Sequence, residues 1–201
     1  MTLIILVRHG QTEWNRDQRF RGLADVPLDQ IGMAQAEKTA ERIAKQWKLH
    51  AIYSSPRSRA KMTAETIARR FDLPVQVYPG LEDFNFGDWQ GLTQEEALQR
   101  WPEQIDNWFK HPQRARIPHG DTLKSVRRRL LATIEELVGK HPDQTITVVG
   151  HTATNRLILM GMLGLENQLF WHLGQDTCAI NLIQAHDLEY TLISMNDTCH
   201  L

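Results

Sequence analysis

The sequence predicts an α/β fold, a three-layer sandwich in which helices flank a mostly parallel central sheet and carry a small helical cap. Short apolar runs alternate with longer segments of helical periodicity along most of the 201 residues. Two of the apolar runs, residues 3–7 and 145–150, are each followed within two residues by a histidine. This placement is typical of strands that deliver side chains to the carboxyl edge of a parallel sheet.

The first half of the chain contains three of the expected strands. They are predicted where apolar residues cluster over four or five positions, at residues 3–7, 51–55 and 75–78. Asp29 opens a helix that extends to residue 48, because apolar residues recur there at three- and four-residue intervals. Pro56 precedes a second helix, which is predicted from residue 57 to residue 71.

The second half of the chain is expected to complete the sheet and to cover it. Helical turns are predicted for the Trp-, Pro- and His-rich residues 95–120. Further on we expect a helix at residues 121–139, a strand at 145–150 and a helix at 153–163. The chain is expected to close with a pair of strands at 179–184 and 190–194, joined at residues 186–188. Because no linker or repeat divides the chain, we expect a single domain over residues 1–201, with a cap inserted around residues 92–120.

The composition is that of an ordinary globular protein, with 41% hydrophobic and 23% charged residues. A formal net charge of −1 produces no strong field, so neither nucleic acid nor a membrane is expected as a partner. Cys178 and Cys199 are expected to be reduced thiols rather than a disulfide. The opening apolar run is too short for a signal peptide, and no run is long enough for a transmembrane helix, which predicts a cytoplasmic protein.

The first strand ends in residues that suit phosphate chemistry. Arg8 and His9 follow the apolar run directly, and Gly10 and Asn15 come soon after. An imidazole can attack phosphorus and carry the phosphoryl group. A guanidinium can hold phosphate oxygens with paired N–H groups. Both side chains would stand at the mouth of a site at the carboxyl end of the strand.

Polar residues also follow two later strands. His151 and Thr152 open a helix directly after residues 145–150, and the N–H groups at a helix start can hold an anion. Arg57 is placed in the first turn of its helix, where a cation opposes the helix dipole, so we expect it to serve a ligand. Arg59 is expected to be a solvated surface residue. Four tryptophans are expected to be packing residues: Trp47, Trp101, Trp108 and Trp171.

Taken together, these segments resemble the histidine phosphatase superfamily and, within it, the phosphoglycerate-mutase-like branch. The matching motifs are Arg8-His9-Gly10 with Asn15, residues 54–63, the Phe-Gly-Asp-Trp-Gln-Gly loop at 86–91, and Gly150-His151. Their order and spacing fit the family from residue 3 to residue 163. The closing residues 196–201 resemble the tail of metal-independent phosphoserine phosphatases of that branch.

The resemblance implies that His9 is the nucleophile and becomes a phosphohistidine. It also implies that four residues surround the phosphate: Arg8, Asn15, Arg57 and a protonated His151. Thr152 is assigned to the same phosphate site because it begins a helix. Arg21 and Gly22 lie in a loop that lines the substrate mouth in the family, so Arg21 would meet a substrate carboxylate or second phosphate, the alternative being a surface arginine.

The acid that protonates the leaving oxygen departs from the family pattern. The family places a glutamate three residues before the Phe-Gly pair, and that position holds Asp83. Glu82 stands beside it, and adjacent residues of an extended segment face opposite ways, so only one of the two should reach the site. We expect Asp83 to be the acid because position outweighs residue identity. Glu82 is either a solvated charge that could meet the substrate or, after a shift of the loop, the residue that takes over as the acid.

These features predict a metal-independent phosphomonoesterase that needs no cofactor and hydrolyses a small phosphorylated metabolite, with phosphoserine as the first candidate. A cofactor-dependent phosphoglycerate mutase is the alternative, although mutases of the family usually carry a longer insertion than residues 92–120. Two other interpretations stay open: another small-metabolite phosphatase, such as an α-ribazole phosphate phosphatase, and a non-catalytic phospho-ligand binder. Exposed aromatic residues in the tail region would suit a homodimer.

Overall fold

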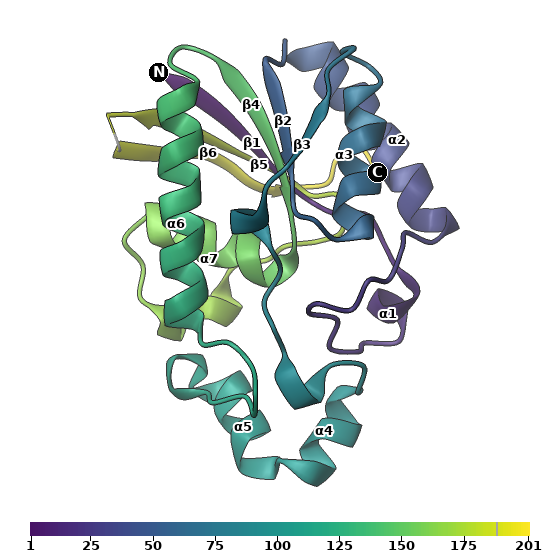
Figure 1. The fold of residues 1–201 in the computed structure, drawn as a ribbon, viewed down its shortest axis with the longest axis vertical. Helices are drawn as coiled ribbons and strands as arrows, with labels where there is room; N and C mark the ends of the chain where they lie inside the picture. The colour runs from purple at the N-terminus through teal and green to yellow at the C-terminus, as the bar shows by residue number, and fades with distance from the viewer. Residues whose placement is uncertain (188) are drawn as a thin grey trace.

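The computed structural model describes residues 1–187 and 189–201, and its six strands form one sheet in the order β3-β2-β4-β1-β5-β6 (Figure 1). The strands are β1 (Thr2–Arg8), β2 (Ala51–Ser54), β3 (Val75–Val77), β4 (Thr145–Gly150), β5 (Ile180–His186) and β6 (Glu189–Asp197). β1 to β4 pair in parallel, whereas β5 is antiparallel to both β1 and β6. The predicted α/β fold with a mostly parallel sheet is confirmed. The predicted connection at 186–188 includes Leu188, which lies outside the described residues.

Helices cover both faces of the sheet (Figure 1). α2 (Gln30–Gln46) and α3 (Ser58–Ala68) pack together on one face, and α6 (Leu123–Lys140) and α7 (Thr152–Met162) pack together on the other. The Asp29 side chain accepts a hydrogen bond from the Gly32 N–H and so caps α2, as the sequence predicts. The short α1 (Glu13–Arg16) follows β1, and α4 (Gln94–Arg100) and α5 (Pro102–Lys110) lie away from the sheet, at the bottom of Figure 1.

The side chains of β1 explain the three layers. Successive residues of a strand point to opposite faces of the sheet. Ile4 and Leu6 belong to the apolar cluster that includes residues of α6 and α7, and Ile5 and Val7 belong to the cluster that includes residues of α2 and α3. All four side chains are fully buried. A strand that is apolar on both faces needs helices on both sides of the sheet. The continuous apolar run at residues 3–7 predicts this arrangement.

The register of the strands brings the polar strand ends together. Arg8 of β1 is opposite Gly150 of β4, so the two histidines that follow these strands emerge at the same level. Ser54 of β2 is opposite Val149, so the next residue, Ser55, reaches the same edge from the other side of β4. Three neighbouring strand ends therefore meet at one point of the sheet.

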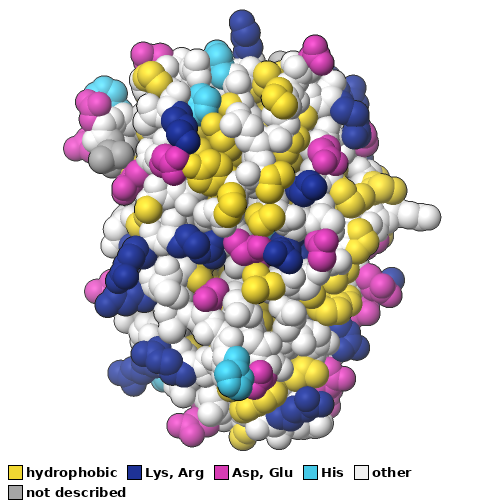
Figure 2. Space-filling view, viewed as in Figure 1, with side chains coloured by type: hydrophobic (Ala, Val, Ile, Leu, Met, Phe, Trp, Pro, Cys, Tyr) yellow, Lys and Arg dark blue, Asp and Glu magenta, His cyan; other side chains and the backbone are white. Residues whose placement is uncertain are grey.

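The surface agrees with the balanced composition. Charged side chains of both signs are interspersed on the face shown in Figure 2, as a net charge of −1 would lead one to expect. Within residues 1–187 and 189–201, no helix combines the length and the apolar character needed to cross a membrane. Cys178 is buried, Cys199 is exposed, and both are free thiols.

Candidate active site

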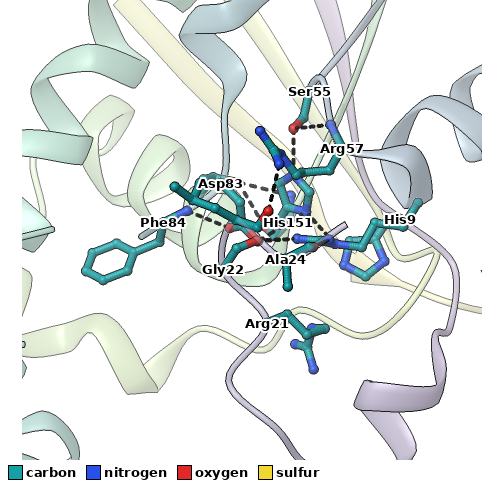
Figure 3. Close-up of polar contacts among 12 residues, drawn as sticks. His9, Arg21, Gly22, Ala24, Ser55, Arg57, Asp83, Phe84 and His151 are labelled. Carbon is teal, nitrogen blue, oxygen red and sulfur yellow. Dashed lines mark hydrogen bonds and ion pairs between the residues drawn. The ribbon is translucent and has the colours of Figure 1, made fainter. Parts of the chain in front are cut away.

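A cavity of about 320 Å³ opens where β1 and β4 end. Among its lining residues are all of the predicted site residues except Arg57 and Glu82, namely Arg8, His9, Asn15, Arg21, Gly22, Asp83, His151 and Thr152. Residues from distant parts of the sequence therefore share one hollow. Figure 3 shows several of these side chains and the polar contacts among them.

The hydrogen bond of His9 fixes its tautomer. Its Nδ1 lies 2.7 Å from the carbonyl oxygen of Gly10, so Nδ1 carries the proton and donates it to that oxygen. Nε2 therefore holds the lone pair, and it is buried with no partner among the described residues. A Cβ on Gly10 would lie only 2.5 Å from the carbonyl oxygen of Gly32, so glycine is required for this turn to pack against α2. The arrangement leaves His9 Nε2 available as a nucleophile.

Hydrogen-bond donors without partners surround this nitrogen. Arg8 Nε and Thr152 Oγ1 are buried and have no partner in the part of the chain that the structure describes. The Asn15 side-chain oxygen accepts from the backbone N–H and the hydroxyl of Thr12, which orients the amide and leaves its NH₂ group to donate. A buried polar group without a partner costs about 1–3 kcal/mol. Several such groups around one cavity indicate a site for a ligand that is rich in acceptor oxygens.

His151 faces His9 across the cavity, with 5.2 Å between the ring centroids. Its Nδ1 accepts a hydrogen bond from Arg59 Nε at 3.2 Å, so in the neutral ring Nε2 carries the proton and donates to the Ser55 hydroxyl at 2.7 Å. Ser55 is thus a residue that positions a predicted site residue, and the sequence reasoning did not identify it.

The structure corrects the expectation for Arg59. It was expected at the surface, but its side chain is fully buried. Its Nη groups donate to the carbonyl oxygens of Gly22 and Ala24, each at 2.7 Å, and to the Asp83 carboxylate at 2.8 Å. Together with the contact to His151, these bonds tie three segments of the site to one guanidinium. A planar group with five donors can do this, which a lysine cannot.

Arg57 and Glu82 are not brought to the cavity. The Arg57 guanidinium forms a two-pronged ion pair with the Glu82 carboxylate and also donates to the carbonyl oxygen of Leu23. Both side chains are partly exposed. Arg57 precedes α3 as its N-cap residue, so it points away from the face that buries Arg59 one half-turn later. Arg57 therefore does not line the cavity, whereas the buried Arg59 contacts both His151 and Asp83.

Asp83 lies inside the site, on the opposite side of its segment from Glu82. Its carboxylate accepts from Arg59 and from the backbone N–H of Phe84, and it lies 3.4 Å from His151 Nδ1. Adjacent residues of this extended segment face opposite ways, as expected, and Asp83 is the one that lines the cavity.

Burial and the cluster of cations lower the pKa of both histidines. Desolvation acts first, and Arg59 adds to it, so the pKa of His9 and that of His151 both lie well below 6.5. The neutral, nucleophilic state of His9 is thereby favoured. The expected protonated His151 differs from this result, because the same burial and positive neighbours disfavour its charged form. Burial, followed by repulsion from Arg21, lowers the pKa of Arg8 to about 9, which keeps it charged at neutral pH.

Aromatic side chains form one wall of the cavity. This aromatic wall consists of Phe86, Trp108, Phe109, Phe170 and Trp171. Trp171 donates through Nε1 to the carbonyl oxygen of Trp108, and the two rings meet edge to face with centroids 5.5 Å apart. Both tryptophans were expected only to pack, and they do pack, but they also line the site. Arg156, four residues after Thr152 on α7, was missed although that spacing places both on one helix face.

Similarity to known proteins extends over the whole chain. Residues 4–198 match the family model of the histidine phosphatase superfamily, branch 1. Phosphoserine phosphatase 1 of Hydrogenobacter thermophilus is 33% identical over 201 residues, which cover 100% of this chain and 95% of that protein. The solved structure of Bacillus stearothermophilus YhfR has a TM-score of 0.95 and 25% identity, covering 100% and 99% of the two chains. A mutant phosphoserine phosphatase from Entamoeba histolytica, solved with phosphoserine, has a TM-score of 0.86 and 28% identity, covering 100% of both chains.

Proposed function

Because the chain belongs to the histidine phosphatase superfamily, branch 1, and is a phosphatase of that family, we propose that it hydrolyses phosphoserine through a phosphohistidine at His9. The observation that carries the proposal is the buried, unpartnered Nε2 of His9 at the centre of the cavity. A lone pair held in this way, beside guanidinium groups and facing a second imidazole, suits attack on a phosphate. The substrate is inferred from relatives named for phosphoserine.

In the first half of the proposed reaction, His9 Nε2 attacks phosphorus and forms a P–N bond. The ester P–O bond breaks at the same time, and the leaving oxygen takes a proton from the Asp83 carboxyl group. Arg8, Asn15 and Thr152 hold the phosphate oxygens through donors that have no other partner. Positioning and charge stabilisation of this kind account for most of the catalysis of phosphoryl transfer.

In the second half, water attacks the phosphorus and gives a proton to the Asp83 carboxylate. The P–N bond breaks, inorganic phosphate leaves, and His9 returns to its neutral state. Among the described residues, no group of three or more His, Cys, Asp or Glu side chains is arranged to hold a metal ion. The proposal therefore assigns the positive charge at the phosphate to arginines of this chain.

The helical segment beyond the sheet completes the proposal. We treat the chain as a single domain whose segment 92–120 acts as a cap, because Trp108 and Phe109 of α5 line the cavity that β1 and β4 open. We further place the protein in the cytoplasm, and we propose a homodimer, neither of which bears on the chemistry.

A phosphate-release screen tests the function. The purified protein should release phosphate from p-nitrophenyl phosphate and phosphoserine, and activity should survive EDTA. The panel should also contain 3-phosphoglycerate and α-ribazole phosphate, with and without 2,3-bisphosphoglycerate. A requirement for the bisphosphate, with isomerisation instead of release, would identify a mutase. Acid-labile ³²P on the wild type, and none on His9→Gln, would locate the phosphohistidine.

A further inference from the structure

Several guanidinium groups line the cavity. Three lining arginines form no ion pair with any described carboxylate: Arg8, Arg21 and Arg156. Arg19 is paired with Glu96, and Asp83 is paired with Arg59 from behind the cavity. A phosphomonoester carries a charge of about −1.5 to −2 near neutral pH. Asp176 acts on both Arg8 and Arg156 and offsets part of their charge. The contacts of each arginine, rather than the sum of charges, therefore decide which of them could bind a second anionic group on the ligand.

Arg156 is held in place through its Nε, which leaves both of its Nη groups to bind a ligand. Its Nε donates to the carbonyl oxygen of Leu173 at 2.7 Å. Its guanidinium carbon lies 4.9 Å from the ring centre of Trp171 and 5.3 Å from that of Phe170, so two rings of the aromatic wall support the plane. Neither Nη group has a hydrogen-bond partner in the part of the chain that the structure describes. This is the fork that binds carboxylates with two parallel hydrogen bonds.

The position of Arg156 on α7 sets its distance from the phosphate site. Thr152, whose hydroxyl is unpartnered, lies four residues earlier on the same face of the helix. One helical turn is about 5.4 Å. In phosphoserine four bonds of about 1.5 Å separate the phosphorus from the carboxyl carbon, which places the two atoms about 5 Å apart. A phosphate at Thr152 would therefore put the carboxylate within reach of Arg156.

Arg21 is the other cation that could take this role, but its contacts make it less suitable. Its Nη1 already donates to the carbonyl oxygens of Trp14 and Arg19, at 3.3 and 3.4 Å. Arg21 therefore keeps its Nε–Nη2 edge for an anion, whereas Arg156, held through Nε, keeps both of its Nη groups. Burial lowers the pKa of Arg21 to about 10, so it remains charged and can still attract an anion to the cavity.

We propose that Arg156 binds a substrate carboxylate through its two Nη groups and so selects phosphomonoesters that carry a carboxylate about 5 Å from phosphorus. The inference rests on the proposed phosphatase function of this site and names the group that the site recognises besides phosphate. Arg156 acts in substrate selection only.

Two substrates isolate the carboxylate. Phosphoserine and phosphoethanolamine differ only in that group, and their leaving oxygens are alike. In Arg156→Gln we expect KM for phosphoserine to rise roughly 10- to 100-fold, because the variant loses a hydrogen bond between two charged groups. The kcat/KM for phosphoethanolamine should change by less than about threefold, because this substrate has no carboxylate. Arg156→Lys keeps the charge but not the two parallel donors, so its KM for phosphoserine should lie between those of the wild type and Arg156→Gln. Arg128→Gln, an exposed arginine of α6, is the matched control and should leave both substrates unchanged.

The wild type gives a second, independent measurement. It should prefer phosphoserine over phosphoethanolamine by at least about tenfold in kcat/KM. Equal rates for the two substrates, or equal losses for both in Arg156→Gln, would overturn the carboxylate assignment. If the wild type hydrolysed 3-phosphoglycerate and not phosphoserine, and lost that activity selectively in Arg156→Gln, the proposed substrate would be wrong while the carboxylate site stood.

Discussion

The floor of the cavity and its aromatic wall are held by different forces. The floor, which we define as Arg8, His9, Asp83 and His151 together with the buried Arg59 that supports them, is fixed by hydrogen bonds to the backbone. Four of its contacts go to carbonyl oxygens, those of Gln175, Gly10, Gly22 and Ala24. The aromatic wall is held mainly by ring contacts, with centroids about 5 to 6 Å apart.

We expect this difference to separate the residues that set the catalytic rate from those that select the substrate. Hydrogen bonds are directional, so the floor places reacting atoms within a few tenths of an ångström. Ring packing is less directional and tolerates substitution with repacking. Changes in the floor should therefore lower kcat for every substrate. Changes in the aromatic wall, or in Arg156 which packs against it, should alter KM for particular substrates. The four predictions that follow test the floor.

The largest effect is expected from His9→Ala. It removes the nucleophile, and loss of a covalent nucleophile costs on the order of 10⁶-fold in rate. The fold should persist, because among the described residues the side chain makes a single hydrogen bond, to Gly10. Turnover of p-nitrophenyl phosphate and circular dichroism measure the two quantities. Substantial turnover by a folded His9→Ala protein would remove His9 from the mechanism.

Arg59 and Arg57 form a matched pair two residues apart. Arg59→Lys should lower kcat/KM by about 10²- to 10³-fold, the loss of a preorganised charged donor network. It should also reduce the urea midpoint, because a lysine keeps the charge but cannot donate to the carbonyl oxygens of Gly22 and Ala24 as well as to Asp83, and a buried acceptor left without a donor costs about 1–3 kcal/mol. Arg57→Lys should change activity by only a few-fold, since Arg57 bonds to Glu82 outside the cavity. The opposite order would show that α3 presents its arginines in the other way.

Asp83→Asn should slow poor leaving groups selectively. Loss of a general acid costs about 10²- to 10⁴-fold when the leaving oxygen needs a proton. Phosphoserine leaves as an alkoxide and should show the full loss, whereas p-nitrophenyl phosphate should lose little. Glu82→Gln is the control and should affect both substrates only slightly, because Glu82 does not line the cavity. Similar small effects of the two variants on phosphoserine would exclude both residues as the proton donor.

The floor could be predicted from the sequence to a large extent. The buried runs before His9 and His151 identify two strands, and the parallel pairing of such strands places both residues at one edge. The sequence does not show which of Arg57 and Arg59 contacts the other site residues, because both lie at the same helix start. Which of the two turns inward depends on the exact N-cap and on Glu82, a residue 25 positions from Arg57 that forms its ion pair. Local pattern does not contain this information.

The aromatic wall was less predictable for a physical reason. Trp108 and Trp171 come from segments 63 residues apart and meet through a side-chain hydrogen bond and ring contacts. Nothing in the residue spacing of either segment indicates that these two tryptophans would meet. Arg156 is the exception, because Thr152 and Arg156 are one helical turn apart and share a face. Applying that spacing to the helix after His151 would have identified it.

The smallest expected effect concerns pH and stability. His9 and His151 have a pKa well below 6.5 in the folded protein, because burial and the nearby arginines disfavour their charged forms. In the unfolded chain both have a pKa near 6.5. Below about pH 6.5 the unfolded state therefore binds more protons, so the free energy of unfolding falls as the pH falls. Each histidine contributes at most about 1.4 kcal/mol per pH unit.

His9→Gln should remove one of these contributions. Urea unfolding between pH 7 and pH 5 measures the slope of the free energy of unfolding against pH, and the variant should be less steep than the wild type by up to about 1.4 kcal/mol per unit. His186→Gln alters an exposed histidine and should keep the wild-type slope. A His9→Gln slope equal to that of the wild type would mean that His9 is charged in the folded protein at pH 5 to 6. A charged ring has no lone pair at Nε2, so the proposed attack on phosphorus would then require a different base.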